Sequence, residues 1–592
     1  MARQLRQQVI IDYDVPAMMR DRTILRANVY RPAGEGRWPV LLRRLPYGKD
    51  LPETNSLLNP VQVARQGYAV IVQDTRGCFA SEGEWDPIRH EAMDGVDTIE
   101  WASQLDYSNG SVGMYGISYN GMTQWLAAIH QPTALKAMIP LMTWKDPFNG
   151  LTFRGGALEL GFLAYWSMQL GFNVLIRRHA ADPDPHALGR AIFMLTKDLD
   201  ALGKYGYWSW PLKEFPPLQR HNIAPFFFEA MEYALNRTYV EPQAIVGKHE
   251  QVKAPTFNIG GWYDLFLKDT IENFKLMREH GSTEQARQSK LLIGPWTHGG
   301  MSNPIGEANF GLASNSALID MRIDLNSLQV LWFDHWLKGI DTGMLQEAPI
   351  KIFVMGANVW RDEQEWPLAR AIERHYYLHS DGHANTLHGD GILSTDLPAD
   401  EMPDQYDYDP ANPVLTQGGA LYMSPEFRPG VFDQRSTEER EDVLVYTTPV
   451  LQESVEVTGP IKVHLWAVTS VPDTDFVARL IDVYPDGYAH NLTDGIIRTR
   501  YRHFERGKAP SLVEPGRAYE YEIDLWATSN VFKKGHCIRL DVTSSNFPRW
   551  DRNPNTGHEL GVNSNLVVAH QTILHDAQHP SFVLLPIVPA AL

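Results

Sequence analysis

The stretch Gly116-Ile117-Ser118-Tyr119-Asn120-Gly121 places a serine between two glycines at a change of hydrophobic period. Residues 111–115 before it are typical of a short buried strand, and the apolar residues between 122 and 129 recur at helical spacing. This pattern predicts a nucleophile elbow, a tight strand-to-helix turn that exposes the Ser118 hydroxyl at the end of a sheet. Side chains at Gly116 or Gly121 would collide with neighbouring elements in such a turn. The second glycine departs from the usual spacing, because Asn120 precedes it.

A serine at neutral pH is a weak nucleophile and needs a general base, which in turn needs an acid to hold it. Residues 255–260 and 290–294 each read as a strand, and the loops that follow them contain Asp264 and His298 respectively. In an α/β sheet, loops at the carboxyl ends of the strands meet at one edge. The order Ser118, Asp264, His298 is the one expected of an α/β-hydrolase. The sequence therefore predicts a catalytic triad made of these three residues.

Each of these residues also has a structural interpretation. Asp264 could cap a helix that starts near Phe266. His298 is one of 21 histidines, and a lone histidine after a strand is usually a surface or loop residue. Asp269 and Glu272 are alternative acids, but both fall within the expected helix. The combined match of strand, loop and chain order favours the triad.

The strand expected at 40–45 ends in Pro46-Tyr47-Gly48. In α/β-hydrolases the early strand-to-helix loop supplies part of the oxyanion hole, and a phenolic O–H at Tyr47 can act as a donor. The backbone N–H of Tyr119, at the start of a helix, is the second expected donor. The alternative for Tyr47 is an aromatic side chain that packs at the edge of the core.

The elbow segment resembles that of a family that includes bacterial cocaine esterase, the α-amino acid ester hydrolases, the glutaryl-cephalosporanate acylases and the X-prolyl dipeptidyl-peptidases. Further segments of this resemblance extend over nearly the whole chain: Gln73-Asp74-Thr75-Arg76-Gly77, Ser81-Glu82-Gly83, Gly260-Gly261-Trp262-Tyr263-Asp264, Gly294-Pro295-Trp296-Thr297-His298, Ser544-Ser545-Asn546-Phe547-Pro548 and Asn553-Pro554-Asn555-Thr556-Gly557.

The resemblance implies an α/β-hydrolase fold and assigns a role to each site residue. Ser118 would be the nucleophile, His298 the base and Asp264 the acid that orients it. The Tyr47 O–H and the Tyr119 N–H would form the oxyanion hole. We expect neither a bound metal nor a cofactor.

The resemblance also implies an aromatic substrate pocket. Trp166, from a helical cap, and Phe266, from the loop after the acid, match the positions of pocket aromatics. The amino acid ester hydrolases bind the substrate ammonium with carboxylates, one of them just after the nucleophile, where this chain has Asn120 and Gly121. Cap glutamates such as Glu229 could supply an acid, as could Glu232, although nothing in their spacing demands it.

We therefore expect a serine hydrolase that cleaves uncharged carboxylic esters, or amides, through an acyl-enzyme. One alternative is an α-amino acid ester hydrolase, β-lactam acylase or X-prolyl dipeptidyl-peptidase. An alternative from another class is a non-catalytic protein that binds a carbohydrate or a partner.

A chain of 592 residues suggests about three domains. Residues 1–144 and 243–350 are expected to form the α/β-hydrolase core. Residues 145–242, with long apolar stretches at 157–175 and 187–202 and no alternation of strands with helices, are expected to form a helical cap. Short strands from 351 to 592, such as 351–355, 461–466 and 536–542, predict a jelly-roll-like β-sandwich, in which 380–415 is expected to be loop.

The net charge is −18, with 53 basic and 71 acidic residues and no long basic run, which argues against nucleic acid or an anionic membrane as a partner. Two cysteines, Cys78 and Cys537, argue against a disulfide-rich secreted protein. Neither a signal peptide in Met1–Gln8 nor a membrane span is expected, so a cytoplasmic location is predicted. Residues 179–186 and 575–579 contain metal-ligand types, but their turns predict solvated side chains. The sequence allows a homodimer.

Overall fold

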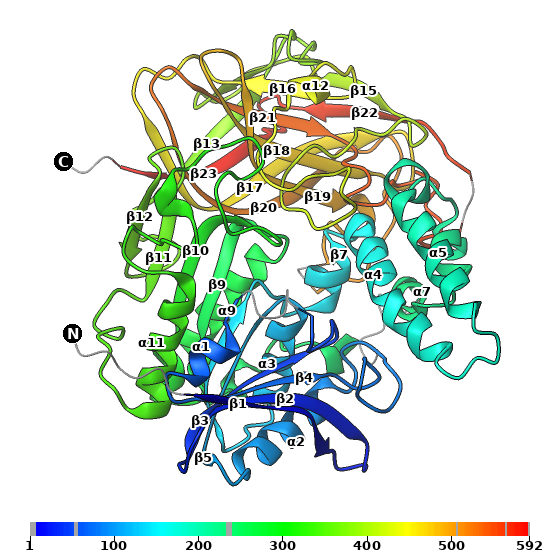
Figure 1. The fold of residues 1–592 in the computed structure, drawn as a ribbon. Helices are drawn as coiled ribbons and strands as arrows, with labels where there is room; N and C mark the ends of the chain where they lie inside the picture. Colours follow the sequence, from blue (N-terminus) through cyan, green and yellow to red (C-terminus); the bar gives the residue numbers. More distant parts are fainter. Residues whose placement is uncertain (1–7, 52–56, 233–239, 505–506, 563–564, 590–592) are drawn as a thin grey trace.

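The structure, a computed structural model, describes residues 8–51, 57–232, 240–504, 507–562 and 565–589 (Figure 1). The segment Met1–Gln8 lies outside them except for its last residue. Two large sheets dominate the molecule, one built mainly by the N-terminal half of the chain and one by the C-terminal half. A group of helices, drawn in cyan and teal, lies beside both sheets (Figure 1).

The first sheet has ten strands in the order β1-β2-β4-β3-β5-β6-β9-β10-β11-β12. Neighbours from β4 to β11 in this order pair in parallel, and the outer pairs are antiparallel. This is the strand order of an α/β-hydrolase, so the predicted fold class is confirmed. The strands are β1 Val9–Met18, β2 Ile24–Pro32, β3 Trp38–Leu45, β4 Ala69–Asp74, β5 Ser108–Ile117, β6 Leu135–Leu141, β9 Phe257–Tyr263, β10 Lys290–Thr297, β11 Ile350–Val354 and β12 Val359–Glu363.

Helices cover both faces of this sheet, which explains its long apolar strands. On β3, Leu41 packs in the same cluster as Phe333 of α11, whereas its neighbour Leu42 packs with Trp125 of α3. Helix α11 ends at its C-cap residue Gly339, which has a left-handed φ of 69°. The helices of this part are α1 Pro60–Ala64, α2 Glu91–Ser103, α3 Tyr119–Ala128, α9 Leu267–His280, α10 Glu284–Arg287 and α11 Leu325–Lys338.

The position of β11 and β12 differs from the expectation. The strand predicted at 351–355 was placed in the C-terminal β-sandwich, but β11 pairs in parallel with β10 and extends the first sheet. Helix α11 forms the crossover connection that parallel strands require, and β12 then returns antiparallel to β11. The boundary predicted at residue 350 is therefore wrong, because both strands belong to the first sheet.

The segment between β6 and β9 is mainly helical, with α4 Leu160–Arg178, α5 Ala187–Asp200, α6 Pro216–Gln219 and α7 Pro225–Glu232. Helices α4 and α5 lie where apolar helical stretches were predicted. A two-residue hairpin, β7 Phe153–Arg154 with β8 Ala157–Leu158, was not expected. Its turn is formed by Gly155 and Gly156, which both have positive φ, at 51° and 89°. Among the described residues, no helix combines the length and the apolar character needed to cross a bilayer.

The second sheet pairs eleven strands, antiparallel except for one parallel contact between β14 and β16. Two of them, β14 and β15, fall within residues 380–415, so the prediction of loop there is wrong in part; residues 404–408 alternate between buried and exposed, as an edge strand does. The jelly-roll arrangement stays a prediction. The elements are β13 Ile372–His379, β14 Ile392–Ser394, β15 Asp404–Tyr408, α12 Arg435–Glu438, β16 Leu444–Thr447, β17 Val455–Thr469, β18 Asp475–Val483, β19 Ala489–Arg498, β20 Tyr519–Phe532, β21 Cys537–Thr543, β22 Ala569–Leu574 and β23 Phe582–Val588.

The β7–β8 hairpin packs closely on the second sheet. A Cβ at Gly155 would lie 2.0 Å from the carbonyl oxygen of Ile496, so only glycine fits. The N–H of Arg498 donates to the Gly155 carbonyl at 2.8 Å, and the N–H of Leu158 donates to Asp551 Oδ1 at 2.6 Å. The C-terminal sheet thus contacts the hairpin that directly precedes α4.

His575, which was expected in a solvated turn, is buried after β22. Its Nε2 lies 3.0 Å from Asp404 Oδ2 and its Nδ1 lies 3.2 Å from Glu401 Oε2. Burial acts to lower the pKa of His575, but the hydrogen bonds and charges of the two carboxylates outweigh it and raise the pKa above 6.5. Folding therefore favours the protonated ring.

The free energy of unfolding should depend on pH through His575. Because the folded pKa is raised, this contribution is fully present below about pH 6.5 and is lost as the pH rises through the folded pKa. Urea unfolding of the wild type and of His575→Gln from pH 6 to pH 9 should show a difference that shrinks toward high pH. A difference that does not change with pH would contradict this assignment.

Candidate active site

Ser118 follows β5 directly and caps the N-terminus of α3. Its backbone has φ 61° and ψ −122°, a conformation that is strained for a residue with a side chain. Two hydrogen bonds hold it there: its N–H donates to the Leu141 carbonyl at 3.0 Å, and its carbonyl accepts from Thr143 Oγ1 at 2.9 Å. The neighbouring strand β6 and the residues after it therefore fix the strained turn.

The two flanking glycines are needed for close approach. Gly116 has φ 142°, and a Cβ there would lie 2.5 Å from Asn120 Cβ. A Cβ at Gly121 would lie 2.7 Å from Thr143 Cβ. The sharp strand-to-helix turn predicted around Ser118 is present, and the later glycine serves the packing of α3 on β6.

The predicted acid and base lie side by side after neighbouring strands. Asp264 follows β9 and is fully buried, and its Oδ2 lies 2.6 Å from Nδ1 of His298, which follows β10. Asp264 Oδ1 accepts a hydrogen bond from the N–H of Phe266 at 2.8 Å. The Asp264 carboxylate therefore contacts both the His298 ring and the backbone of the loop that leads into α9, whose N-cap residue is Phe266.

Ser118 and His298 line the same cavity, of about 640 Å³, together with Tyr47. Among the described residues, the His298 ring forms a hydrogen bond with Asp264 and none with Ser118 Oγ. Such catalytic contacts are often loose without substrate and tighten when it binds. The strained Ser118 and the His298 ring, which is hydrogen-bonded to Asp264, therefore line one cavity.

Tyr47 lies after β3 with its phenol beside Ser118. Its oxygen accepts a hydrogen bond from Trp166 Nε1 at 3.2 Å, which leaves its own proton to be donated elsewhere. Burial raises the pKa of Tyr47 well above its usual value, against the opposing effect of hydrogen bonds with Trp166 and Ser118. The phenol is therefore a protonated donor at neutral pH.

The side chain of Tyr119 points away from the cavity. Its hydroxyl donates to Glu91 Oε1 at 2.8 Å and accepts from the Ile88 N–H at 2.9 Å. The backbone N–H of Tyr119 belongs to the first residue of α3, where a helix has no acceptor of its own to offer. A role for Tyr119 in the site can therefore come only from its backbone.

The two predicted pocket aromatics lie in different positions. Trp166 of α4 forms part of the cavity wall and stacks on Phe162, with ring centroids 5.8 Å apart. Phe266 is fully buried and packs edge-on against the His298 ring at 5.3 Å. Phe266 thus packs against the His298 ring and is not among the residues that line the cavity. Its contact with substrate stays a prediction.

Tyr422 and Arg43 line the cavity but were not predicted. Tyr422 belongs to the C-terminal half of the chain, packs against the His298 ring at 5.4 Å and donates to Gln169 Oε1 at 3.1 Å. No sequence pattern links it to the site, because it is brought there by tertiary contact alone. Arg43 lies on β3, two residues before the strand ends at Leu45. A charged residue in a strand that is otherwise mostly apolar was a signal in the sequence that could have pointed to the site.

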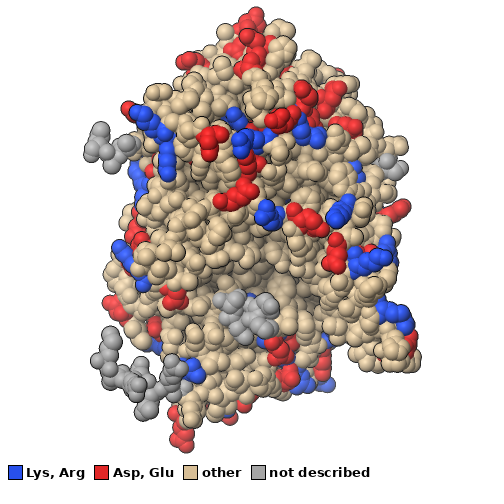
Figure 2. All heavy atoms as spheres, turned by 45° about the horizontal axis from the view of Figure 1, so that its top comes forward, with Lys and Arg blue, Asp and Glu red and all other residues tan. Residues whose placement is uncertain are grey.

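Among the described residues that line the cavity, one carries a carboxylate. This residue is Asp324, the N-cap of α11, which accepts a hydrogen bond from the Ser327 N–H at 2.9 Å. Glu229 lies outside this lining and pairs with Arg89 at 3.6 Å. On the face seen in Figure 2, acidic and basic side chains are interspersed without a broad patch of one sign.

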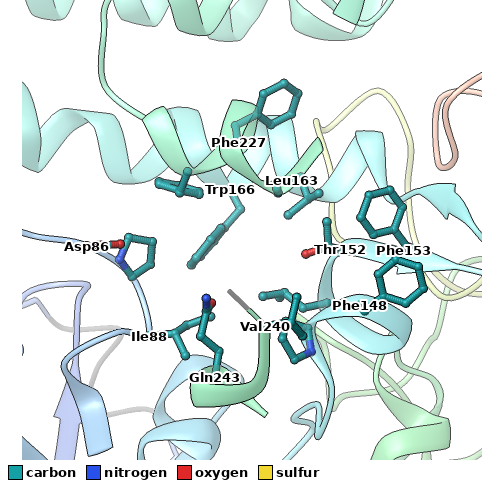
Figure 3. A pocket seen from close by; sticks show the side chains of 15 residues that line it. Asp86, Ile88, Phe148, Thr152, Phe153, Leu163, Trp166, Phe227, Val240 and Gln243 are labelled. Atoms are coloured by element: carbon teal, nitrogen blue, oxygen red, sulfur yellow. The ribbon is translucent and has the colours of Figure 1, made fainter. Parts of the chain in front are cut away.

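A second, apolar cavity lies on the other side of Trp166. It measures about 50 Å³, and Figure 3 shows Trp166, Leu163, Phe148 and Ile88 arranged around it. Trp166 lines both cavities and therefore acts as the wall between them.

An elbow serine that shares a cavity with a carboxylate-held histidine is characteristic of a hydrolase on the α/β-hydrolase fold. The chain matches the family described as X-Pro dipeptidyl-peptidase (S15 family) over residues 21–300. Residues 342–584 match the X-Pro dipeptidyl-peptidase C-terminal non-catalytic domain. The cocaine esterase of Rhodococcus sp. (strain MB1 Bresler) is 36% identical over 581 residues, which cover 97% of this chain and 98% of that protein. The chain therefore belongs to the S15 family of serine hydrolases.

Two solved structures share the fold over the whole chain. An aminopeptidase from the marine sediment archaeon Thaumarchaeota archaeon has a TM-score of 0.78 at 23% identity, covering 100% of this chain and 98% of its own. An α-amino acid ester hydrolase also has a TM-score of 0.78, at 24% identity, covering 99% and 98%. These likenesses extend the shared architecture through the C-terminal sheet.

Proposed function

We propose that the chain hydrolyses carboxylic esters through a Ser118–His298–Asp264 triad. The observation that carries this proposal is the 2.6 Å contact between Asp264 and His298 at the cavity that also contains the strained Ser118. His298 takes the proton of Ser118 as the hydroxyl attacks the substrate carbonyl, and Asp264 stabilises the resulting imidazolium. The alcohol leaves with that proton, and water then hydrolyses the acyl-enzyme by the same steps.

In the same proposal, the Tyr47 O–H and the Tyr119 N–H stabilise the oxyanion. Both groups stand next to Ser118, one as a protonated phenol and the other at a helix N-terminus, where the partial charge is positive. The indole N–H of Trp166 donates a hydrogen bond to the Tyr47 oxygen and so fixes the position of the phenol. The donors are thus fixed before the reaction, as preorganised stabilisation requires.

The Tyr47 phenol should contribute strongly to the rate. In Tyr47→Phe, we expect kcat to fall by about 10²- to 10³-fold, because one oxyanion donor is lost. Steady-state kinetics on a neutral ester measures this effect. Tyr422→Phe is the matched control, since its hydroxyl lies in the same wall but donates to Gln169. An unchanged rate in Tyr47→Phe would refute the role.

The proposed substrates are uncharged small-molecule esters, with amides as a secondary class. The likeness to a cocaine esterase supports the ester class, and the presence of one carboxylate, that of Asp324, among the described lining residues supports an uncharged substrate. A free amino group would need an acidic partner near Ser118, as in the alternative of an amino acid ester hydrolase, acylase or X-prolyl peptidase. Membership of the S15 family disfavours a non-catalytic binding protein.

Paired kinetics distinguish these substrate classes. The methyl ester of an N-acetylated amino acid should be hydrolysed at least about tenfold more efficiently, by kcat/KM, than the ester with a free amine, because a buried ammonium would lack a counter-charge. Equal efficiency, or a preference for the free amine, would favour the aminopeptidase-like alternative instead.

A cytoplasmic location belongs to the same proposal. Assembly as a homodimer is part of the proposal as a possibility that the sequence allows.

A further inference from the structure

Arg154 holds the loop that carries Asp264. This arginine ends strand β7 and is 4% exposed. Its Nη2 donates to the carbonyl of Leu265, the residue next to Asp264. Its Nε donates to Glu159 Oε1 at 3.2 Å, so the guanidinium is itself oriented by a buried carboxylate. The hydrogen bond therefore fixes the loop between β9 and α9 immediately after the proposed acid.

A tryptophan from the C-terminal sheet covers the guanidinium. The Arg154 Cζ lies 4.2 Å from the ring centroid of Trp526, which belongs to β20. Trp550, also from the C-terminal half, donates through Nε1 to the same Glu159 oxygen at 3.1 Å. A cation that stacks on an indole is stabilised and restricted to one plane. The orientation of Arg154 thus depends on two residues of the C-terminal half.

The backbone of β20 is distorted at the tryptophan. Trp526 has φ 64°, which is unusual for a bulky residue, and the pairing of β20 with β17 shifts register between Asp524 and Ala527. The Trp526 N–H donates to Asp524 Oδ1 at 2.8 Å, and the other carboxylate oxygen of Asp524 pairs with Lys268 of α9 at 2.7 Å. Bulges of this kind re-aim a side chain, and here the ring is aimed at Arg154.

We propose that Arg154, stacked on Trp526, is a positioning residue that holds the Asp264 loop where the Asp264 carboxylate can bind the His298 ring. This inference rests on the proposed role of Asp264. Both hydrogen bonds of the Asp264 carboxylate, to Phe266 N–H and to His298 Nδ1, require the loop conformation that Arg154 fixes. Displacement of the loop by a fraction of an ångström would weaken the hold on the imidazolium. The C-terminal sheet thereby contributes to the rate without touching substrate.

The expected effect is on kcat. Arg154→Met keeps the length of the side chain but loses the hydrogen bonds, and it should lower kcat about 10- to 100-fold with KM nearly unchanged. Trp526→Leu should act in the same direction, and Trp526→Phe, which keeps an aromatic face, should restore most of the rate.

The matched control is Arg552→Met. Arg552 is also a largely buried arginine that lies over a tryptophan, 5.1 Å from the ring of Trp208, and it donates to the Pro410 carbonyl at 3.0 Å. It links the cap to the C-terminal half as Arg154 does, but it lies outside the contacts of the Asp264 loop. We expect its kcat to stay within about threefold of the wild type, although its unfolding temperature should fall as that of Arg154→Met does.

A double-mutant cycle with Asp264→Asn tests the inference most sharply. If Arg154 acts through Asp264, Arg154→Met should lower kcat at least tenfold in the wild type but less than about twofold in the Asp264→Asn background. Equal losses in both backgrounds, or an equal loss in Arg552→Met, would overturn the inference. If Asp264→Asn itself leaves kcat unchanged, the proposed triad fails instead. Trp526→Phe and Trp526→Leu give the same comparison should Arg154→Met fold poorly: equal rates in these two variants would also overturn it.

Discussion

Ser118→Ala should lose nearly all turnover, with kcat on a neutral ester falling by a factor on the order of 10⁶. The reason is that no acyl-enzyme can form without the hydroxyl, whereas the oxyanion donors and the cavity remain. Binding of substrate should change little, since the methyl of alanine fits the space that the serine occupies. Stopped-flow and steady-state kinetics with a chromogenic ester measure both quantities.

The matched control is Ser302→Ala. Ser302 lines the same cavity as Ser118 but does not lie at the elbow, so its removal should change kcat by less than about threefold. The strain at Ser118 predicts a further difference. Because alanine has the same backbone restriction as serine, Ser118→Ala should not unfold the protein, and circular dichroism should match the wild type. Appreciable turnover in well-folded Ser118→Ala would contradict the proposal.

Asp264→Asn should lower kcat by about 10⁴-fold. An amide at this position offers its N–H to His298 Nδ1, so the ring would carry its proton on the nitrogen that must accept the Ser118 proton. The contact of 2.6 Å means that the histidine has no freedom to avoid this partner. The rate of acylation, measured by the pre-steady-state burst, should fall with kcat.

Asp269→Asn provides the control for this second prediction. Asp269 is equally buried on α9, accepts a hydrogen bond from the Lys145 N–H at 3.2 Å and has its pKa raised to about 6, mainly by burial. It was one of the two alternative acids in the sequence, yet its carboxylate contacts Lys145. We expect a change of less than about tenfold in kcat, and a loss as large as that of Asp264→Asn would transfer the role to Asp269.

Much of the fold and the proposed triad could be predicted because their signals are local. Gly116 and Gly121 mark the turn around Ser118, and Asp264 and His298 each follow a short apolar strand. The sheet then brings the ends of β5, β9 and β10 together without further information. Each site residue could therefore be recognised from its own neighbours in the sequence, although the three residues are far apart along the chain.

The contacts that were not predicted are tertiary. Tyr422 reaches the His298 ring from the C-terminal half, and Trp526 reaches Arg154 only because its strand bulges with a positive φ. The hydrophobic pattern of residues 351–355 shows a strand but not its partner, so its membership of the first sheet depended on a pairing that is invisible in sequence. Alternation of polar and apolar residues fixes the face of a strand, not its neighbour.

The most direct test of the central claim is the mass of the peptide that carries Ser118 after reaction with a fluorophosphonate. The proposed triad predicts one phosphonyl group per chain on this serine, with loss of esterase activity in proportion to labelling. It also predicts no labelling of this peptide in Ser118→Ala and much slower labelling in Asp264→Asn. A chain that keeps its activity while Ser118 is fully labelled, or that loses activity through labelling of another residue, would contradict the account.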